Sequence, residues 1–387
     1  MLRTIAFFTS CRGDIGILSP LIKKIYKTKG INALLFVGGT HLSKKYGFTI
    51  KEIQKEGLKI TKKYNYVVES DKSHSLSVST NKSGILAAKF FRDYNFDYVC
   101  ILGDRYERIP IILNSIIFKK PIIHLHGGEI TQGLIDEQVR HLISKASHLH
   151  FVICNQYKKN LLSLGEDSKR IFNSGSLAID NIKNTKKINW KKFLEKNQLD
   201  PNKPFAILTY HPVTLEFNLT LETQLENVFS SLKEFDIQVL ITAPGIEVGS
   251  NVLISKIKNK MKKYLRYKSA YVESLGHVAL YSLIPNSSFI IGNSSFGIIE
   301  VPYFRIPTIN IGDRQKGRLL HKSIISADYS KQSISKSIRK ALDTNFKNDI
   351  KKMKYLFSSG NAAEKIVRII KKVRIDQNFL QKKFIKK

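Results

Sequence analysis

Short apolar stretches with strand-like sequence alternate with helix-like segments along most of the chain, and this alternation limits the possible folds most. In the first half the strand-like stretches are Thr4–Phe8, Ala33–Val37, Tyr98–Leu102, Ile122–Leu125 and Leu149–Ile153. Segments between them, such as Pro20–Lys27, show the 3.6-residue period of a helix. Strands that alternate with helices form a parallel, doubly wound sheet, whose ligands bind beyond the carboxyl ends of the strands.

The pattern breaks and then starts again, which predicts two domains. The polar stretch Asn184–Asn189 and the turn sequence Asp200–Pro204 mark the break. The second series of strand-like stretches is Phe205–Thr209, Val239–Thr242, Phe289–Ile291 and Thr308–Ile311. A chain of 387 residues exceeds what one hydrophobic core usually supports. We therefore predict an α/β protein with two similar domains, 1–183 and 184–362, and a cleft between them.

The chain is strongly basic, with a formal net charge of +33. Its lysines are dispersed, without an arginine–aromatic stripe or a nucleic-acid-binding motif, so a solvated surface is favoured over nucleic-acid binding. Near the end, Lys371–Lys387 mixes basic and apolar residues. An amphipathic helix packed on the body is favoured there over attraction to an anionic membrane surface.

The opening residues and the cysteines indicate a cytoplasmic protein. The apolar residues before Cys11 are too few for a signal peptide, and no apolar run approaches the length of a membrane span, so stable membrane insertion is not expected. Cys11, Cys100 and Cys154 have neither a disulfide framework nor zinc-like spacing, and we interpret them as reduced core residues.

Acidic and basic side chains follow the strand-like stretches of the first half. Asp104 and Arg105 come after one strand and Glu129 after the next, while Asp136 and Arg140 share a helix face. Carboxylates gathered at strand ends could divide acid and base roles, because burial and mutual repulsion separate their pKa values. The alternative is structural: turn and cap residues, and an ordinary helix ion pair.

Histidines raise the question of a metal site. His124 and His126 alternate on one strand, and His148 and His150 follow nearby, but no third ligand has a convincing spacing, so no metal is predicted. His211 follows the first strand of the second half, where it would face a ligand, although a structural histidine is a fair alternative.

The run GNSSFGIIE from Gly292 follows a strand and opens a helix. Such a turn can bind a phosphate through backbone N–H groups and the positive end of the helix, and Glu300 could accept hydrogen bonds from sugar hydroxyls. A plain helix cap is the alternative. Arg12, Arg314 and Arg318 are candidate partners of a diphosphate, because a guanidinium group matches phosphate oxygens in bidentate fashion.

Taken in order, these motifs resemble one family. LGDRYE, HLHGGE, DEQVRHLISKASHLHF, FNSGSLAIDNI, HPVTLE, GNSSFGIIEVP and INIGDRQKGR are similar to the hydrolysing UDP-N-acetylglucosamine 2-epimerases of bacterial sialic-acid capsule synthesis. The resemblance covers nearly the whole chain and implies the GT-B fold, two Rossmann-like domains with the active site between them. It also implies that the last segment, 363–387, packs back on the first domain.

The resemblance implies an activity without a cofactor or metal. UDP-N-acetylglucosamine would lose UDP through 2-acetamidoglucal, and water would add to give N-acetylmannosamine. By position, the catalytic acids would be Asp104, Glu129 and Asp136. The substrate-binding residues would be Arg12, Arg105, His126, Arg140, His211, Ser294, Ser295, Gly297, Glu300 and Arg314.

The chain also departs from the family pattern. The opening motif is Ser10–Ile15, which keeps the arginine and the acid of the family but changes the residues around them. At position 126 some relatives have glutamate, whereas this chain has His126, a change that the capsule-type enzymes share. Phe296 replaces a small residue, and TAPGIEVGSN from Thr242 replaces an Asn-Ala-Asp segment, so uracil or sugar contacts there are in doubt.

Several alternatives stay open at the level of sequence. The substrate could be the UDP-linked 2,4-diacetamido-2,4,6-trideoxy sugar of legionaminic-acid synthesis. A GT-B glycosyltransferase would share the nucleotide half but not the acids at the sugar, and a silent nucleotide-sugar binder would not need them. A homodimer or homotetramer is expected, and the sequence does not distinguish the two.

Overall fold

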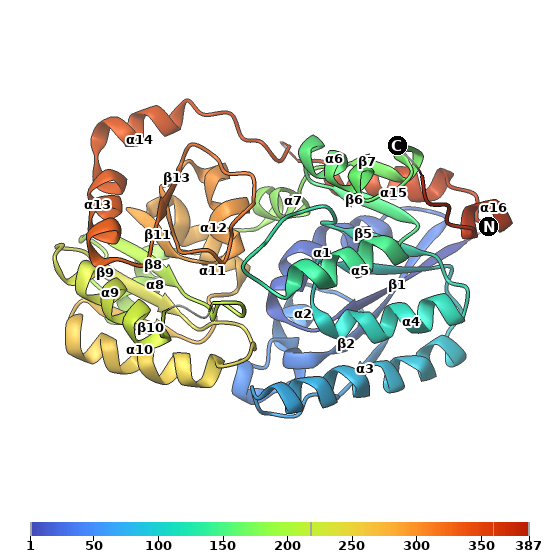
Figure 1. Cartoon of the computed structure of the whole chain (residues 1–387), viewed down its shortest axis with the longest axis horizontal. Coiled ribbons are helices and arrows are strands. Elements are labelled where there is room, and N and C mark those ends of the chain that lie inside the picture. Colours follow the sequence, from blue (N-terminus) through green and yellow to red (C-terminus); the bar gives the residue numbers. More distant parts are fainter. Residues whose placement is uncertain (1, 217–218, 359, 386–387) are drawn as a thin grey trace. The chain divides into compact units, whose positions relative to one another are not determined.

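The computed structural model describes residues 2–216, 219–358 and 360–385, which divide into two compact units (Figure 1). The first unit contains residues 1–129, 136–184 and 357–387, and the second contains 130–135 and 185–356. The predicted boundary at 183/184 lies next to this division. The final segment joins the first unit from Phe357 onward, earlier than predicted, and the short loop Ile130–Ile135 belongs to the second unit.

The first unit is built on a parallel sheet with the strand order β3-β2-β1-β4-β5-β6-β7. Its strands are β1 Arg3–Thr9, β2 Ile31–Gly38, β3 Lys62–Tyr64, β4 Tyr98–Leu102, β5 Ile122–Leu125, β6 Leu149–Val152 and β7 Ile171–Asn173. The register pairs Phe7 with Leu35 of β2 and with Cys100 of β4. Buried on both faces, the central strands are continuous apolar runs, as parallel strands require.

Helices cover both faces of this sheet. They are α1 Arg12–Tyr26, α2 Ile50–Lys55, α3 Ser73–Asp93, α4 Ile109–Ile117, α5 Asp136–Ala146, α6 Asn155–Ser163, α7 Leu177–Asn184, α15 Ala362–Lys372 and α16 Gln377–Leu380. The 3₁₀ turns are η1 Gly39–Leu42, η2 Lys44–Tyr46, η3 Tyr106–Arg108 and η4 Ser168–Arg170. Core residues of α1, α2, α7 and α15 form one layer, and those of α3, α4 and α5 form the other.

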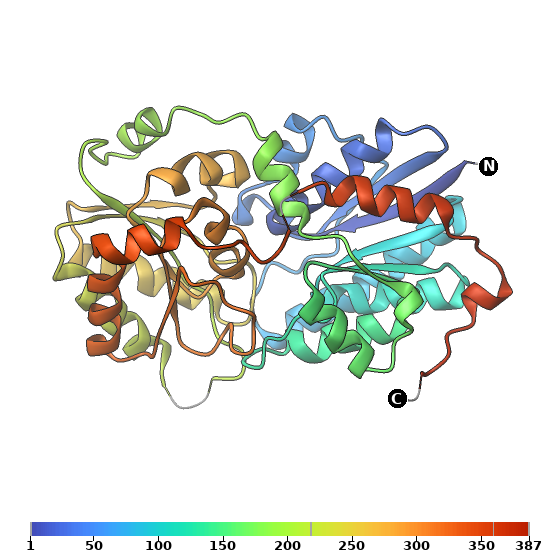
Figure 2. The same cartoon turned by 90° about the horizontal axis from the view of Figure 1, so that it is seen from above.

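The end of the chain completes the first unit. Figure 2 shows α15 beside α7, and the carboxylate of Asp180 accepts hydrogen bonds from the backbone N–H groups of Ala362 and Ala363, at 3.2 and 2.7 Å. The first N–H groups of α15 are thus bound by the side chain of a residue nearly two hundred positions earlier in the chain. The predicted amphipathic helix over Lys371–Lys387 is wrong in its extent: α15 ends at Lys372 and only the four residues of α16 are helical among those described beyond it.

The second unit repeats the architecture with a parallel sheet of order β10-β9-β8-β11-β12-β13. Its strands are β8 Phe205–Thr209, β9 Gln238–Thr242, β10 Ser269–Val272, β11 Phe289–Gly292, β12 Thr308–Ile311 and β13 Ile324–Ala327. Its helices are α8 Trp190–Lys196, α9 Leu221–Lys233, α10 Ser250–Tyr264, α11 Gly276–Leu283, α12 Ser295–Ile299, α13 Lys331–Leu342 and α14 Thr344–Lys351, with the 3₁₀ turns η5 Ile284–Asn286 and η6 Val301–Phe304. Two Rossmann-like units confirm the predicted fold class.

None of the described helices has the length and apolar character needed to cross a lipid bilayer.

Candidate functional site

Arg140 is the centre of the polar cluster in the first unit. The side chain is fully buried on α5, and its Nε donates to Oδ2 of Asp104 at 3.0 Å. Its Nη1 donates to the backbone oxygen of Glu129 at 2.9 Å and to Oε2 of Glu137 at 2.7 Å. Residues that follow β4 and β5 are thus joined to one helix at the carboxyl edge of the sheet. Burial alone would lower the pKa of Arg140, but Asp104 and Glu129 outweigh it and raise that pKa.

His126 and Glu129 form a second pair at this edge. Nδ1 of His126 lies 2.8 Å from Oε1 of Glu129, and both residues are less than 10% exposed. His126 has a φ of +66°, which is uncommon for a residue with a side chain. Within the described part of the chain, its Nε2 is buried without a hydrogen-bond partner. A buried nitrogen left unsatisfied by the protein is a natural contact for a polar ligand.

The glycines after His126 allow this turn to pack closely. A Cβ atom on Gly128, whose φ is +75°, would lie 2.3 Å from the backbone oxygen of Tyr157. A Cβ atom on Gly127 would lie 2.8 Å from Nδ1 of His124. Larger residues at these two positions would therefore move Glu129 away from His126.

Arg12 is the first residue of α1 and follows the turn after β1. A buried ion pair holds this turn in place. Oδ2 of Asp14 lies 2.6 Å from Nη2 of Arg108 and accepts from the backbone N–H groups of Ser10 and Cys11 at 2.7 and 3.1 Å. Nη1 of Arg108 donates to the backbone oxygen of Phe8 at 3.0 Å. Burial would raise the pKa of Asp14, but Arg108 and Ser10 outweigh it and hold the pKa below its usual range.

The remaining predicted residues of the first unit have other surroundings. Asp136 is the first residue of α5, and the next residue, Glu137, forms an ion pair with Arg140 at 2.7 Å. Arg105 forms an ion pair with the buried Glu107 at 2.6 Å. The carboxylate of Glu107 therefore orients the side chain of Arg105, which stays a predicted substrate-binding residue.

In the second unit, Asn293 links the ends of β8 and β11. Its Oδ1 accepts from the backbone N–H of His211 at 2.7 Å, and its Nδ2 donates to the backbone oxygen of His211 at 2.8 Å. Arg314 and Gln315, after β12, both donate to the backbone oxygen of Asn293, at 3.3 and 2.9 Å. His211 and Arg314 are thus brought to one edge of the sheet by a residue that the sequence analysis did not single out.

Glu247 adds an unexpected carboxylate to this edge. It comes from the TAPGIEVGSN segment, and its Oε1 accepts from Nη2 of Arg314 at 2.9 Å and lies 3.6 Å from Nδ1 of His211. The segment that departs from the family pattern therefore contacts two of the predicted phosphate-binding residues. The segment follows β9, whose carboxyl end lies at the same sheet edge as those of β8 and β11, and this position could have identified Glu247 as a site residue.

The serine turn has the predicted position after β11. Gly292 has a φ of +134°, and a Cβ atom there would lie 1.9 Å from the backbone oxygen of Thr209, so only glycine fits. Ser294 is the N-cap of α12, Ser295 its first residue, and Gly297 lies against Thr308. Because α12 has only five residues, backbone N–H groups matter more than a helix dipole. Glu300 is the residue after α12, and its carboxylate accepts a hydrogen bond from the hydroxyl of Tyr281 at 3.3 Å.

The histidines of β5 and β6 have protein partners. Nε2 of His124 lies 2.8 Å from the backbone oxygen of Gly103, and Nε2 of His150 lies 3.0 Å from Oε2 of Glu166. Nδ1 of His148 accepts from the backbone N–H of Ile122 at 3.2 Å. Within 2–216, 219–358 and 360–385, no group of three or more His, Cys, Asp or Glu side chains is arranged to hold a metal ion.

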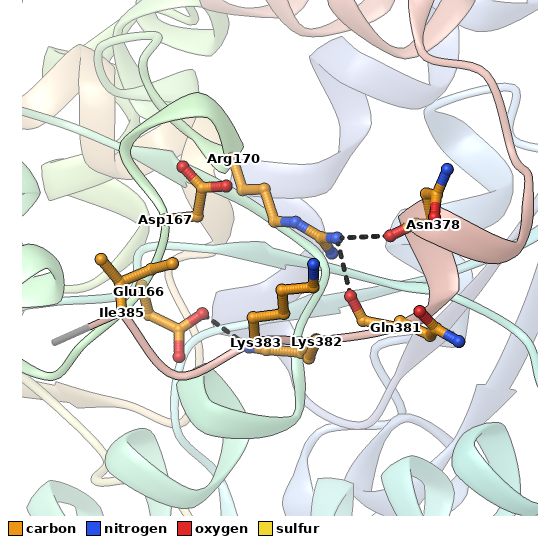
Figure 3. A pocket seen from close by; sticks show the side chains of 8 residues that line it. All are labelled: Glu166, Asp167, Arg170, Asn378, Gln381, Lys382, Lys383 and Ile385. Carbon is orange, nitrogen blue, oxygen red and sulfur yellow. Dashed lines mark hydrogen bonds and ion pairs between the residues drawn. The ribbon is translucent and has the colours of Figure 1, made fainter.

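A separate pocket lies where the end of the chain meets the first unit (Figure 3). Its lining residues are Glu166, Asp167, Arg170, Asn378, Gln381, Lys382, Lys383 and Ile385. Lys382 pairs with the buried Glu166 at 2.6 Å, and Arg170 donates to the backbone oxygens of Asn378 and Gln381 at 3.3 and 3.1 Å. These contacts hold the end of the chain in place, and none of the lining residues is a predicted site residue.

Two Rossmann-like units, each with polar side chains at the carboxyl edge of a parallel sheet, define the GT-B fold class. Within this class, the model of the UDP-N-acetylglucosamine 2-epimerase family matches residues 23–371, and the chain belongs to that family. The resemblance inferred from the motifs is confirmed.

Individual relatives cover nearly the whole chain. GDP/UDP-N,N'-diacetylbacillosamine 2-epimerase (hydrolyzing) of Campylobacter jejuni is 37% identical, with 99% of each chain covered. Polysialic acid biosynthesis protein P7 of Escherichia coli is 32% identical, with 99% of this chain and 95% of that protein covered. Among solved structures, the MnaA–UDP complex of S. aureus superposes with a TM-score of 0.80 at 20% identity and covers 96% of each chain, which shows the fold.

Proposed function

We propose that the protein catalyses the hydrolytic 2-epimerisation of a UDP-linked 2-acetamido sugar, releasing UDP and a sugar with inverted configuration at C2. Family membership over residues 23–371 supports the reaction class. The observation that carries the proposal is the cluster in which buried Arg140 holds Asp104, Glu137 and the backbone of Glu129 at one sheet edge. The reaction needs such acids, because a proton must leave C2 and later return to it.

Asp104 is the proposed base of the first step. Two nitrogens of Arg140 bind its Oδ2, so the carboxylate has a fixed direction while its side chain remains 22% exposed. It would take the C2 proton as the bond between C1 and the diphosphate oxygen breaks, giving UDP and 2-acetamidoglucal. Water then adds its hydroxyl to C1, and a proton reaches C2 from the opposite face. The His126–Glu129 pair is the proposed source of this proton, since it has a buried ring nitrogen available for a ligand.

The second unit would bind the leaving group. Arg314 and His211 supply positive charge and hydrogen bonds for the diphosphate, and the Ser294–Ser295 turn supplies backbone and hydroxyl donors. Glu300, at the end of α12, would accept hydrogen bonds from the ribose.

Two substrates fit the proposal. The 37% identity to the diacetylbacillosamine enzyme favours the UDP-linked 2,4-diacetamido-2,4,6-trideoxy sugar. The 32% identity to polysialic acid biosynthesis protein P7 favours a role in sialic-acid synthesis, for which the motifs predict UDP-N-acetylglucosamine as the substrate. Both have the 2-acetamido group and the C2 proton that the chemistry needs, so a direct comparison decides between them.

The test is incubation of the purified protein with each UDP-sugar in deuterated water, followed by NMR of the products. We expect UDP and a manno-configured hexosamine with deuterium at C2 from one substrate. Asp104→Asn should abolish the reaction with UDP affinity nearly unchanged, whereas Asp93→Asn on the exposed face of α3 should have no effect. Release of UDP without inversion and deuteration at C2, or transfer of the sugar to an acceptor, would contradict the proposal.

A further inference from the structure

Lys382 binds the end of α5 from the terminal segment of the chain, residues 374–385. Its Nζ donates to the backbone oxygens of Ser144 and Ser147, at 3.4 and 2.5 Å, and pairs with Oε2 of Glu166 at 2.6 Å. An ammonium group has three N–H donors, and these three oxygens accept all of them. The side chain of Lys382 is only 20% exposed. It is therefore a fixed part of the fold and not a solvated surface lysine.

Glu166 joins the terminal segment to α5. The carboxylate is buried and lies 2.8 Å from Nζ of Lys145, which belongs to α5, and 3.0 Å from Nε2 of His150. Burial would raise the pKa of Glu166, but hydrogen bonds from these two residues and from Lys382 outweigh it and lower that pKa to about 2. The carboxylate thus stays charged, and a buried charge depends on its partners.

Contacts on both sides of Lys382 hold the terminal segment in place. Arg170 donates to the backbone oxygen of Gln381 at 3.1 Å (Figure 3). The backbone N–H of Ile385 donates to the backbone oxygen of Gly165 at 3.2 Å. Because the segment is anchored before and after Lys382, the ammonium group can hold the end of α5 in one position.

Helix α5 contacts the proposed base and the backbone that precedes it. Arg140 binds Oδ2 of Asp104 directly. One turn further along α5, Oγ of Ser144 lies 3.2 Å from Nδ1 of His124, and Nε2 of His124 lies 2.8 Å from the backbone oxygen of Gly103. Gly103 is the residue before Asp104. A movement of α5 would therefore displace both the carboxylate of Asp104 and its backbone.

We propose, on the basis of the function proposed above, that Lys382 is a positioning residue of the epimerisation: by holding the end of α5, it keeps Asp104 within reach of the C2 proton. The carbonyl end of a helix carries partial negative charge, which an ammonium group offsets. A displacement of about 1 Å at a reacting group can lower turnover by about 100-fold. A residue that touches only the far end of α5 can therefore control the rate of the reaction.

The first test compares Lys382→Met with Lys383→Met in the full chain. Lys383 is the adjacent lysine of the same pocket and is exposed. Lys382→Met should lower kcat by about 10- to 100-fold, with KM and UDP affinity within about twofold of wild type, because the base moves while the binding residues stay. Lys383→Met should match the wild type. Lys382→Arg keeps the positive charge and should recover about a third of kcat or more, whereas a purely structural role would lower Tm without changing kcat of the folded protein.

A second pair of variants keeps the test decisive if Lys382→Met folds poorly. Ser144 and Ser147 are both fully buried, and alanine leaves their backbone oxygens available to Lys382. Ser144→Ala removes the contact with His124, whereas the hydroxyl of Ser147 donates within its own turn, to the backbone oxygen of Ile143 at 2.7 Å. Ser144→Ala should lower kcat by about three- to tenfold at unchanged KM, the factor expected for one lost hydrogen bond, and Ser147→Ala should not.

Hydrogen exchange measures the positioning without turnover. The backbone N–H of Gly103 donates to the backbone oxygen of Leu125 at 2.9 Å, and it should exchange about tenfold faster in Lys382→Met than in Lys383→Met, as should the amides of α5. If the wild type turns over neither UDP-sugar, the proposed function fails, and the exchange rates still decide whether Lys382 positions this turn. Equal exchange in the two lysine variants, a kcat of Lys382→Met within twofold of wild type, or an equal loss of kcat in the two serine variants would overturn the proposal.

Discussion

Replacing Arg108 by methionine should destabilise the first unit more than any change of a surface charge. The guanidinium group is fully buried, pairs with Asp14 at 2.6 Å and donates to the backbone oxygen of Phe8 at 3.0 Å. Removing one member of a buried pair costs about 3–5 kcal/mol, because the other charge stays buried. Asp14 would keep its bonds from Ser10 and Cys11, so the lower end, about 3 kcal/mol, is expected.

Native-state hydrogen exchange separates this effect from the second unit. The amides of β1 should exchange about 100-fold faster in Arg108→Met, the factor that corresponds to about 3 kcal/mol. Trp190 is the only tryptophan of the chain and stacks on Phe205 in the second unit, so its fluorescence transition in urea should not change. Arg92→Met, which breaks an exposed pair with Asp93, is the control and should leave β1 unaffected.

A double substitution of Arg108 and Asp14 tests whether the unpaired carboxylate causes the destabilisation. Because the destabilisation comes from an uncompensated carboxylate, Arg108→Met with Asp14→Asn should be more stable than Arg108→Met alone. The same double variant should bind UDP less well than wild type, since the turn that carries Arg12 loses its fixed geometry. If β1 exchanges less than fivefold faster in Arg108→Met, the ion pair is not a main support of this turn and the argument is wrong.

Three further predictions concern ligand, metal and pH. Glu247→Gln should tighten UDP binding in calorimetry by about two- to fivefold, because the carboxylate beside Arg314 competes with phosphate. Weaker binding would show that the Glu247 carboxylate orients Arg314 instead. Turnover should survive EDTA, since His124, His148 and His150 have protein partners. His148→Ala should affect stability more than turnover. Loss of activity in EDTA that Mg²⁺, Mn²⁺ or Zn²⁺ restores would contradict this. Lowering the pH from 6.5 to 4.5 should destabilise the first unit. Burial lowers the pKa of His41 to about 4 and of His124 to about 3, whereas the unfolded chain binds their protons near pH 6.5, so each contributes a loss of about 1.4 kcal/mol per pH unit. A urea midpoint of the first unit that does not depend on pH would refute this pH prediction.

The inner strands of both sheets were predictable from the sequence, and the outermost strands were not. Inner strands such as Phe205–Thr209 are buried along their whole length and therefore appear as continuous apolar runs. The strands missed by the analysis are the edge strands β3, β7, β10 and β13, which are short and partly exposed. Their pairing depends on the neighbouring strand, and so their own side chains carry little signal.

The candidate site was predictable where a polar residue lies in the turn after a strand. Asp104, His211 and Ser294 lie two residues beyond the end of a strand and Glu129 four residues beyond, and the structure places them at sheet edges. Partners contributed by distant segments were not predictable. Arg108 reaches Asp14 across 94 positions, and Glu247 reaches Arg314 across 67. Such contacts depend on the strand order, which a single sequence does not reveal.

The attachment of the chain's end to the first unit sets an order of folding during synthesis. Residues 185–356, which make up nearly all of the second unit, leave the ribosome before the segment that contributes α15 and Lys382. Until then the carboxylates of Asp180 and Glu166 lack the partners that α15 and Lys382 provide. The usual sequence, in which an N-terminal domain finishes first, is therefore reversed. A released chain that ended at residue 356 would have all residues of the second unit attached to a first unit that still exposes the surface covered by α15.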